Sequence, residues 1–138
     1  MNTTSNVDVL VVDDDADDRG LTLRALRGMA NPPTTHEAED GVQAIEYLCR
    51  NPGPRLVLLD LKLPFRNGIE VLQAVRGGGY CPSTPIVMLT SSEHERDMAA
   101  AYAAGANGYI VKPGTYAEYL DWIRRAADYW LEINRTPE

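Results

Sequence analysis

Short apolar segments alternate along this chain with segments of helical periodicity, and no other feature of the sequence constrains the fold as strongly. The apolar segments are rich in Val, Leu and Ile and lie at Val7–Val12, Arg55–Leu59, Thr84–Leu89 and Tyr109–Val111, with a weaker candidate at Thr34–Ala38. Near-continuous apolar runs of this length are typical of strands that are buried on both faces, as in a parallel sheet.

Between these segments, apolar side chains recur at the spacing of an amphipathic helix. Helices are predicted at Asp17–Met29, Gly41–Arg50, Gly68–Arg76, Glu93–Ala104 and from Tyr116 to about Ile133. A strand followed by a helix, repeated five times, predicts an α/β fold with a doubly wound, five-stranded parallel sheet. Right-handed crossovers then place helices on both faces of the sheet.

A single domain accounts for all of these elements, as a length of 138 residues allows. The predicted domain spans residues 7–128, with residues 1–6 as an N-terminal tail and residues 129–138 as a C-terminal extension of the last helix and tail. The formal net charge of −7 argues against nucleic-acid and anionic-membrane partners. Neither a signal-peptide pattern nor a membrane-length apolar run is visible, so a cytoplasmic location is expected.

Polar side chains follow four of the predicted strands where each strand ends. Three aspartates, Asp13–Asp15, follow the first strand, Asp60 follows the third, Thr90–Ser92 follow the fourth and Lys112 follows the fifth. Ligands of open parallel sheets bind outside these carboxyl ends. Carboxylates brought so close repel one another, and Mg2+ relieves that repulsion. A carboxylate nucleophile, a metal and an ammonium group together indicate phosphoryl transfer to an aspartate.

This arrangement resembles the receiver domain of two-component response regulators. The matching segments appear in the family's order over about residues 7–128: Val11–Asp14, Glu37–Gly41, Leu58–Pro64 with Gly68, Val87–Ser91, Gly105–Ala106, and Gly108–Tyr109 with Lys112–Pro113. The resemblance implies a flavodoxin-like fold. It also implies a signalling protein, not an enzyme, that accepts a phosphoryl group from a sensor histidine kinase and assists its own phosphorylation and dephosphorylation. A downstream protein or phosphotransfer partner would read its state.

Site residues follow from the resemblance position by position. Asp60 matches the phosphoacceptor, and Asp13 and Asp14 match the acidic pair that holds Mg2+ together with Asp60. The backbone carbonyl of Lys62 matches the remaining protein ligand of the metal.

A second group of residues matches the part of the family's site that binds and reports the phosphoryl group. Lys112, Thr90 and Ser91 match the phosphoryl-binding positions, and Thr90 with Tyr109 matches the conformational switch. The resemblance also implies a cis peptide bond between Lys112 and Pro113. A peptide bond before proline adopts the cis form at a much lower free-energy cost than other peptide bonds.

The C-terminal segment Asp128–Leu131 and the acidic opening Asp13–Asp18 resemble stand-alone regulators that are paired with phytochrome-type histidine kinases. The last helix and tail carry more aromatic surface than one helix of a small domain can bury, and such surplus usually marks an interface. A two-fold homodimer is therefore expected. Its predicted contacts are Tyr116, Tyr119, Trp122, Tyr129 and Trp130.

Other interpretations of the same residues remain open at this point. The acidic segment after the first strand could be a solvated turn and helix cap. Asp13 and Asp15 also form an Asp-x-Asp pair like that of haloacid-dehalogenase-type phosphatases, but this leaves Asp60 and Pro64 unexplained. A pseudo-receiver that binds partners without being phosphorylated is the main alternative, and only a labelling assay separates it from a phosphoacceptor.

Overall fold

A computed structural model describes residues 7–51 and 53–137, and it contains one five-stranded parallel sheet. The strands are β1 (Val9–Val12), β2 (Thr35–Ala38), β3 (Leu56–Leu59), β4 (Ile86–Thr90) and β5 (Gly108–Val111). Their order across the sheet is β2-β1-β3-β4-β5, and every neighbouring pair is parallel. The predicted doubly wound α/β fold is confirmed. The predicted tail at residues 1–6 lies outside the described residues.

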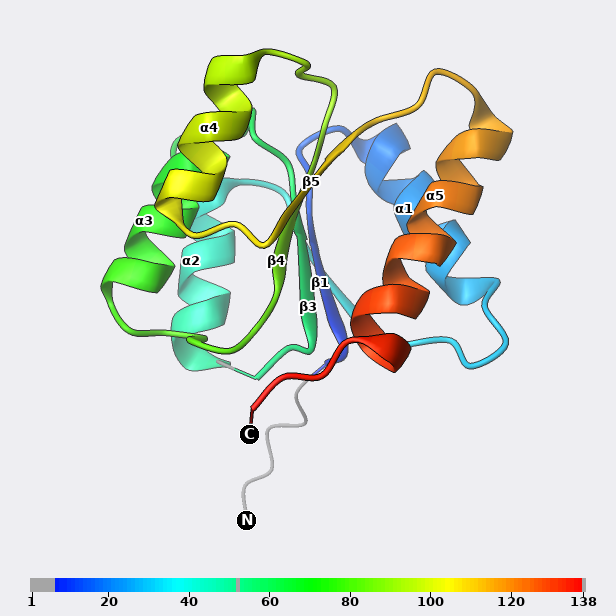
Figure 1. Ribbon diagram of the computed structural model, residues 1–138, viewed down its shortest axis with the longest axis horizontal. Helices are drawn as coiled ribbons and strands as arrows, with labels where there is room; N and C mark the ends of the chain where they lie inside the picture. The colour runs from blue at the N-terminus through cyan, green and yellow to red at the C-terminus, as the bar shows by residue number, and fades with distance from the viewer. Residues whose placement is uncertain (1–6, 52, 138) are drawn as a thin grey trace.

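Five α-helices cover the two faces of the sheet (Figure 1). They are α1 (Ala16–Arg27), α2 (Gly41–Arg50), α3 (Gly68–Gly77), α4 (Glu95–Ala104) and α5 (Tyr116–Asp128). One face is covered by α1 and α5, and the other is covered by α2, α3 and α4. The last predicted helix was expected to run to about Ile133, but α5 ends at Asp128 and a π-helical turn, η1 (Tyr129–Ile133), follows it.

Side-chain alternation along the strands divides the core into two layers. On β1, Leu10 and Val12 pack toward α2 and α3, whereas Val9 and Val11 pack toward α1 and α5. All four side chains are at most 1% exposed, which explains why the strand reads as a continuous apolar run. In contrast, β2 lies at the edge of the sheet and buries only Ala38, which is why its sequence pattern is weak.

Helix caps set the loops that lead out of the strands. The Asp15 carboxylate accepts hydrogen bonds from the backbone N–H groups of Asp17 and Asp18, so α1 starts immediately after β1. Asn67 and Glu70 form a capping box at the start of α3, and Thr115 caps α5. Parallel pairing of β1 with β3, β3 with β4 and β4 with β5 brings the carboxyl ends of these strands to one edge of the sheet, where the capped helices begin. Within the described part of the chain, no helix has the length and hydrophobicity required to span a membrane.

Candidate functional site

Three aspartates gather at the carboxyl ends of two neighbouring strands. Asp13 and Asp14 follow β1, Asp60 follows β3, and one carboxylate oxygen of each lies within 4.8 Å of the others. The two strands pair in register with Val12 opposite Leu59, so the residues that follow them meet at one edge of the sheet. Asp13 and Asp60 are buried and Asp14 is exposed, so the cluster opens toward solvent on the Asp14 side.

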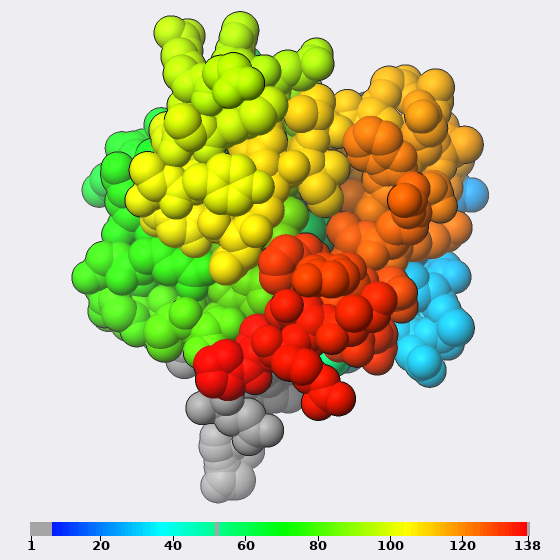
Figure 2. All heavy atoms as spheres, viewed as in Figure 1, coloured from blue at the N-terminus to red at the C-terminus, as the bar shows by residue number. Residues whose placement is uncertain are grey.

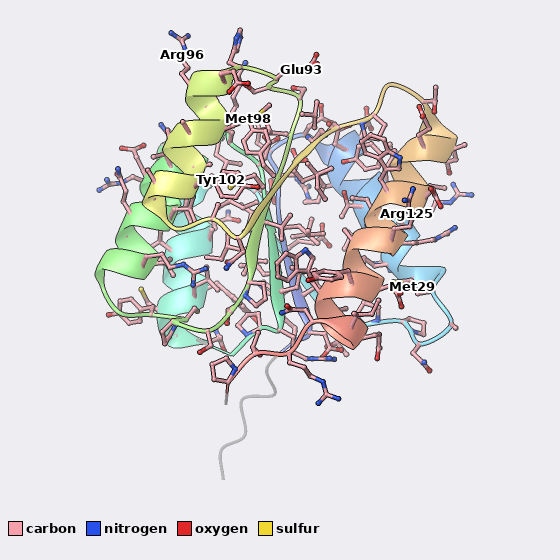
Figure 3. The ribbon with its side chains drawn as sticks, viewed as in Figure 1. Met29, Glu93, Arg96, Met98, Tyr102 and Arg125 are labelled. Carbon is pink, nitrogen blue, oxygen red and sulfur yellow. The ribbon has the colours of Figure 1, made fainter. Side chains whose placement is uncertain are left out.

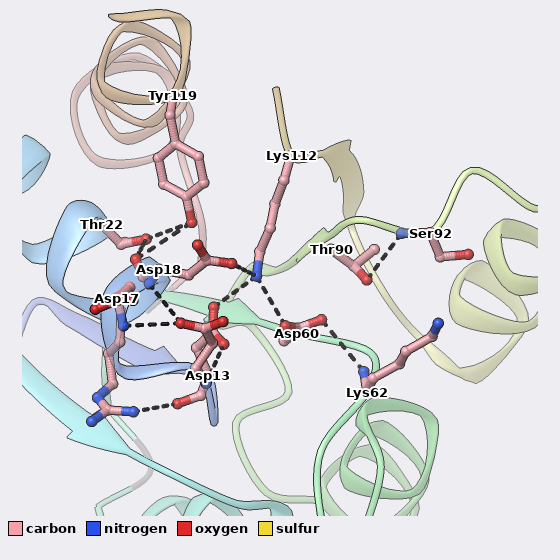
Figure 4. Close-up of polar contacts among 12 residues, drawn as sticks. Asp13, Asp17, Asp18, Thr22, Asp60, Lys62, Thr90, Ser92, Lys112 and Tyr119 are labelled. Carbon is pink, nitrogen blue, oxygen red and sulfur yellow. Dashed lines mark hydrogen bonds and ion pairs between the residues drawn. The ribbon is translucent and has the colours of Figure 1, made fainter. Parts of the chain in front are cut away.

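Lys112, the residue after β5, reaches across this cluster. Its ammonium group donates hydrogen bonds to Asp13 Oδ2 at 2.9 Å and to Asp60 Oδ2 at 3.0 Å (Figure 4). A third bond, to Asp18 Oδ2, measures 2.8 Å. The Lys112 side chain is only 9% exposed, so these carboxylates replace most of its hydration.

Burial and charge act in opposite directions on the ionisable groups here. Burial raises the pKa of Asp13 to about 6, although the hydrogen bond from Lys112 and the charge of that residue pull it down. Burial alone would lower the pKa of Lys112, but the hydrogen bonds that it donates to Asp18 and Asp13 and the charge of Asp60 outweigh burial and raise the pKa above its usual range. Lys112 is therefore protonated at neutral pH. Ionisation of the buried Asp13 carboxyl is less favourable than that of an exposed aspartate.

The chemistry of the donor set fits a hard divalent cation. Asp13, Asp14 and Asp60 offer oxygen ligands alone, which Mg2+ prefers, and three carboxylates, those of Asp13, Asp18 and Asp60, share the single ammonium group of Lys112. These three aspartates would hold the ion. Bound there, it would supply positive charge beside the Asp60 carboxylate.

Thr90 and Ser91 lie at the end of β4, beside the cluster. Thr90 is fully buried, and its hydroxyl accepts a 3.4 Å hydrogen bond from the Ser92 backbone N–H. Ser91 is exposed. Among the described residues, neither hydroxyl makes a hydrogen bond with the unmodified Asp60 carboxylate, and their binding of a phosphoryl group stays a prediction.

The described geometry agrees with comparisons against known proteins. The family model for the response regulator receiver domain matches residues 9–124, which is most of the chain. This chain belongs to the response regulator receiver family.

Individual receivers resemble the chain over most of its length. The probable methanogenesis regulatory protein FilR2 of Methanothrix harundinacea is 32% identical, covering 94% of this chain and 86% of its own. The crystal structure of the phosphorylated cyanobacterial phytochrome response regulator RcpA superposes with a TM-score of 0.89 at 28% identity, covering 97% and 100% of the two chains. The Mn2+-bound form of the response regulator Rcp1, which is known from Synechocystis, gives a TM-score of 0.86 at 29% identity, covering 94% and 98%.

In this receiver, Tyr109 connects the predicted switch residues. Its hydroxyl donates a 3.1 Å hydrogen bond to the backbone carbonyl of Ser92, which follows Thr90 by two residues. Burial raises the pKa of Tyr109, so the phenol stays protonated and remains a donor at neutral pH. Ser92 in turn donates from its hydroxyl to Asp97 at 2.5 Å, which connects the same loop to α4.

Lys62 borders Asp60 on the side away from Lys112. Its backbone N–H donates to Asp60 Oδ1 at 3.4 Å. Lys62 also lines an open hollow of about 670 Å3 between the loop after β3 and the start of α4, together with Asp14, His94 and Arg96. The role of the Lys62 carbonyl as a metal ligand remains a prediction.

The cis bond expected between Lys112 and Pro113 is not found. Across residues 7–51 and 53–137, every peptide bond is trans. The trans form is intrinsically favoured even before proline, and Lys112 reaches its three carboxylates from it.

The predicted dimer contacts divide into two groups. Tyr119 is only 4% exposed and its hydroxyl contacts Thr22 inside the domain, so its inclusion in the interface was wrong. Tyr116, Trp122 and Tyr129 are 48%, 37% and 45% exposed. Trp130 is half-buried, packs against the core and meets the Tyr129 ring edge-on at 5.0 Å.

Asp18 is the site residue that the sequence did not single out for a contact. It belonged to the acidic opening, but its bond to Lys112 joins residues that are 94 positions apart. Helical spacing gave no signal for it, because Asp14 precedes the N-cap Asp15 and lies outside α1.

Proposed function

We propose that this receiver is phosphorylated on Asp60 by a sensor histidine kinase in an Mg2+-dependent reaction. One observation carries the proposal: the Asp60 carboxylate lies 3.0 Å from the Lys112 ammonium, inside a cluster with Asp13 and Asp14. The Mn2+-bound structure of Rcp1 and the phosphorylated structure of RcpA support it, because both proteins resemble this chain over most of its length.

The transfer is a displacement at phosphorus. An oxygen of Asp60 forms a bond to the phosphorus atom as the bond from phosphorus to the kinase histidine breaks, and the histidine nitrogen keeps the bonding electron pair. Lys112 compensates charge on the phosphoryl oxygens, since it is already held at this position. The metal held by Asp13, Asp14 and Asp60 would supply further positive charge for the same oxygens.

The output follows from connections between the loop after β4 and its neighbours. Once Asp60 carries a phosphoryl group, Thr90 and Ser91 gain an acceptor with strong oxygens, and the loop moves toward it. Because Ser92 accepts a hydrogen bond from Tyr109 and donates one to Asp97, that movement changes the face formed by α4, β5 and α5. A downstream protein or phosphotransfer partner reads this face.

The same face supports a proposed homodimer. Figure 2 shows α4, α5 and the C-terminal segment gathered on one side of the molecule. An apolar hollow of about 600 Å3 lies between β5 and α5 and includes Tyr109, Trp122 and Arg125. Tyr102 on α4 and Arg125 on α5 lie on either side of β5 (Figure 3). Tyr116, Trp122, Tyr129 and Trp130 are the proposed contacts.

The likeness to RcpA and Rcp1 also supports a phytochrome-type kinase as the phosphodonor. RcpA is described as a cyanobacterial phytochrome response regulator, and this chain spans nearly its full length. We further propose a cytoplasmic protein with its receiver domain at residues 7–128 and a C-terminal extension at 129–138.

Intact mass after incubation with Mg2+ and a small acyl phosphate tests the phosphoacceptor. A gain of one phosphoryl group is expected in the wild type and in Asp17→Asn, an exposed charge-matched control. No gain is expected in Asp60→Asn or without Mg2+. If the acyl phosphate gives no label, the assay is repeated with phosphorylated sensor kinases, including a phytochrome-type kinase. Absence of label from every donor would contradict the proposal and favour the pseudo-receiver.

A further inference from the structure

Asp18 contacts Lys112 at the shortest distance of any carboxylate, yet it stands outside the metal-binding cluster. The contact measures 2.8 Å, against 2.9 Å to Asp13 and 3.0 Å to Asp60 (Figure 4). The carboxylates that group closely enough to share an ion are Asp13, Asp14 and Asp60. Among the described residues, Asp18 is therefore the one carboxylate partner of Lys112 that lies outside the proposed metal position.

The position of Asp18 is fixed from both sides of its backbone. Its N–H group donates to the Asp15 carboxylate at 3.1 Å. Its carbonyl accepts hydrogen bonds from the Thr22 hydroxyl at 3.1 Å and from the Tyr119 hydroxyl at 3.5 Å. Since Tyr119 belongs to α5, the backbone of the first turn of α1 is held by its own helix and by α5, and this places the Asp18 side chain beside Lys112.

We propose that Asp18 is a positioning residue that keeps the Lys112 ammonium beside Asp60 when a divalent cation occupies the site. This inference rests on the proposed function. Once Asp13 and Asp60 share their charge with a metal, Asp18 is the remaining counter-charge for Lys112. Without it, the buried ammonium is uncompensated, repels the divalent cation and loses its preferred position.

Two lysines in the whole chain, Lys62 and Lys112, make the position of Lys112 directly observable. Lysine ammonium protons are seen by proton–nitrogen NMR only where burial and ion pairing slow their exchange with water. With saturating Mg2+, the wild type is expected to show a protected ammonium signal from Lys112, assigned by its loss in Lys112→Arg. The signal is expected to broaden beyond detection in Asp18→Asn and to persist in Asp17→Asn.

Magnesium affinity gives a second, independent measurement. Calorimetric titration is expected to show an Mg2+ dissociation constant about three- to tenfold higher in Asp18→Asn than in the wild type, because the Lys112 charge then opposes the ion. Asp17→Asn removes the same charge from the same helical turn, but Asp17 is exposed and solvent screens it. Its expected change is less than twofold. Asp18→Glu restores the carboxylate and is expected to recover most of the affinity.

The outcomes separate this role from a general electrostatic effect and from the proposed function. Equal changes in Asp18→Asn and Asp17→Asn would overturn the positioning role, as would an ammonium signal that survives in Mg2+-bound Asp18→Asn. Circular dichroism on each variant verifies the fold, and Asp18→Asn keeps the backbone carbonyl that Thr22 and Tyr119 contact. Neither measurement requires phosphorylation, so failure to label Asp60 would leave both results interpretable.

Discussion

Tyr109 on β5 donates its phenolic hydrogen bond to the backbone carbonyl of Ser92, at 3.1 Å, and so ties the loop after β4 to the edge strand of the sheet. The loop follows Thr90, the last residue of β4, whose buried hydroxyl accepts a hydrogen bond from the Ser92 backbone N–H. Both backbone groups of Ser92 are thus hydrogen-bonded, one to Thr90 and one to Tyr109, the two residues predicted to form the switch. A displacement of Thr90 toward Asp60 therefore alters the Tyr109 contact without any rearrangement of the sheet.

Tyr109→Phe is expected to lower the free energy of unfolding by about 1 kcal/mol, because it removes this hydrogen bond and leaves the ring in place. Amide hydrogen exchange in the loop at residues 91–94 is expected to become faster. Tyr102→Phe is the matched control, since Tyr102 is 52% exposed on α4. Urea unfolding and exchange measurements check both changes, and equal effects of the two substitutions would contradict the structural role of the bond.

Ser92→Ala is expected to cost about 1.5 kcal/mol of stability, because the Ser92 hydroxyl donates to the Asp97 carboxylate and accepts from the His94 N–H. Loss of these bonds releases the first turn of α4 from the loop. The neighbouring Ser91→Ala changes an exposed hydroxyl and is expected to alter stability by less than about 0.5 kcal/mol. Thermal and urea unfolding measure the stability of both variants. Equal losses of stability in Ser92→Ala and Ser91→Ala would contradict the role of the Ser92 hydrogen bonds.

The sequence predicted that the aspartates and Lys112 would lie together, because the ends of the strands determine their positions. Asp13, Asp60 and Lys112 each follow an apolar run, and a parallel sheet brings such positions to one edge. This reasoning did not reach Asp18, because its contact with Lys112 depends on how α1 packs against α5 and the sheet. That contact depends on three-dimensional distances that no local pattern encodes.

The misassignment of Tyr119 has a similar physical origin. Aromatic residues on α5 were treated as one stripe, but helical geometry separates them. Tyr119 shares its face with Ile123 and Ala127, four and eight residues later, and all three are buried against α1 and the sheet. Trp122 and Tyr129 are seven residues apart and lie on the exposed side. Only the burial of each side chain shows which face meets the core.

Mg2+ is expected to stabilise the protein more at pH 8 than at pH 5. Burial raises the pKa of Asp13 to about 6 in the folded, metal-free protein, against an ordinary value of 3.8. The folded state therefore holds an extra proton between these values. The contribution of Asp13 to stability is present below about pH 4 and is lost as pH rises through 6. Metal binding requires the ionised carboxylate, so the gain from Mg2+ grows over that range.

Melting temperatures with Mg2+ and with chelator, measured at pH 5 and pH 8, check this expectation. Asp13→Asn removes both the titrating group and one metal ligand, so its melting temperature is expected to respond little to Mg2+ at either pH. A wild-type Mg2+ effect of equal size at both pH values would show that Asp13 does not control metal binding in this range.

Trp122→Ser combined with Tyr129→Ser is expected to convert a homodimer into a monomer. The two side chains lie on one exposed side of the C-terminal helical segment, and Trp122 also lines the hollow beside β5. Large aromatic side chains commonly carry most of the energy of an interface, so their loss is expected to weaken association at least a hundredfold. Sedimentation velocity over a range of concentrations measures the change, with and without phosphorylation of Asp60.

Tyr80→Ser provides the control for loss of exposed aromatic surface in general. Tyr80 is 39% exposed, close to the 37% of Trp122, but it lies in the connection after α3, away from α5. The control is expected to associate like the wild type, because the self-complementary patch of a two-fold dimer would remain intact. A wild type that sediments as a monomer at all concentrations in both phosphorylation states would contradict the dimer. The aromatic side of α5 would then be free for a different protein.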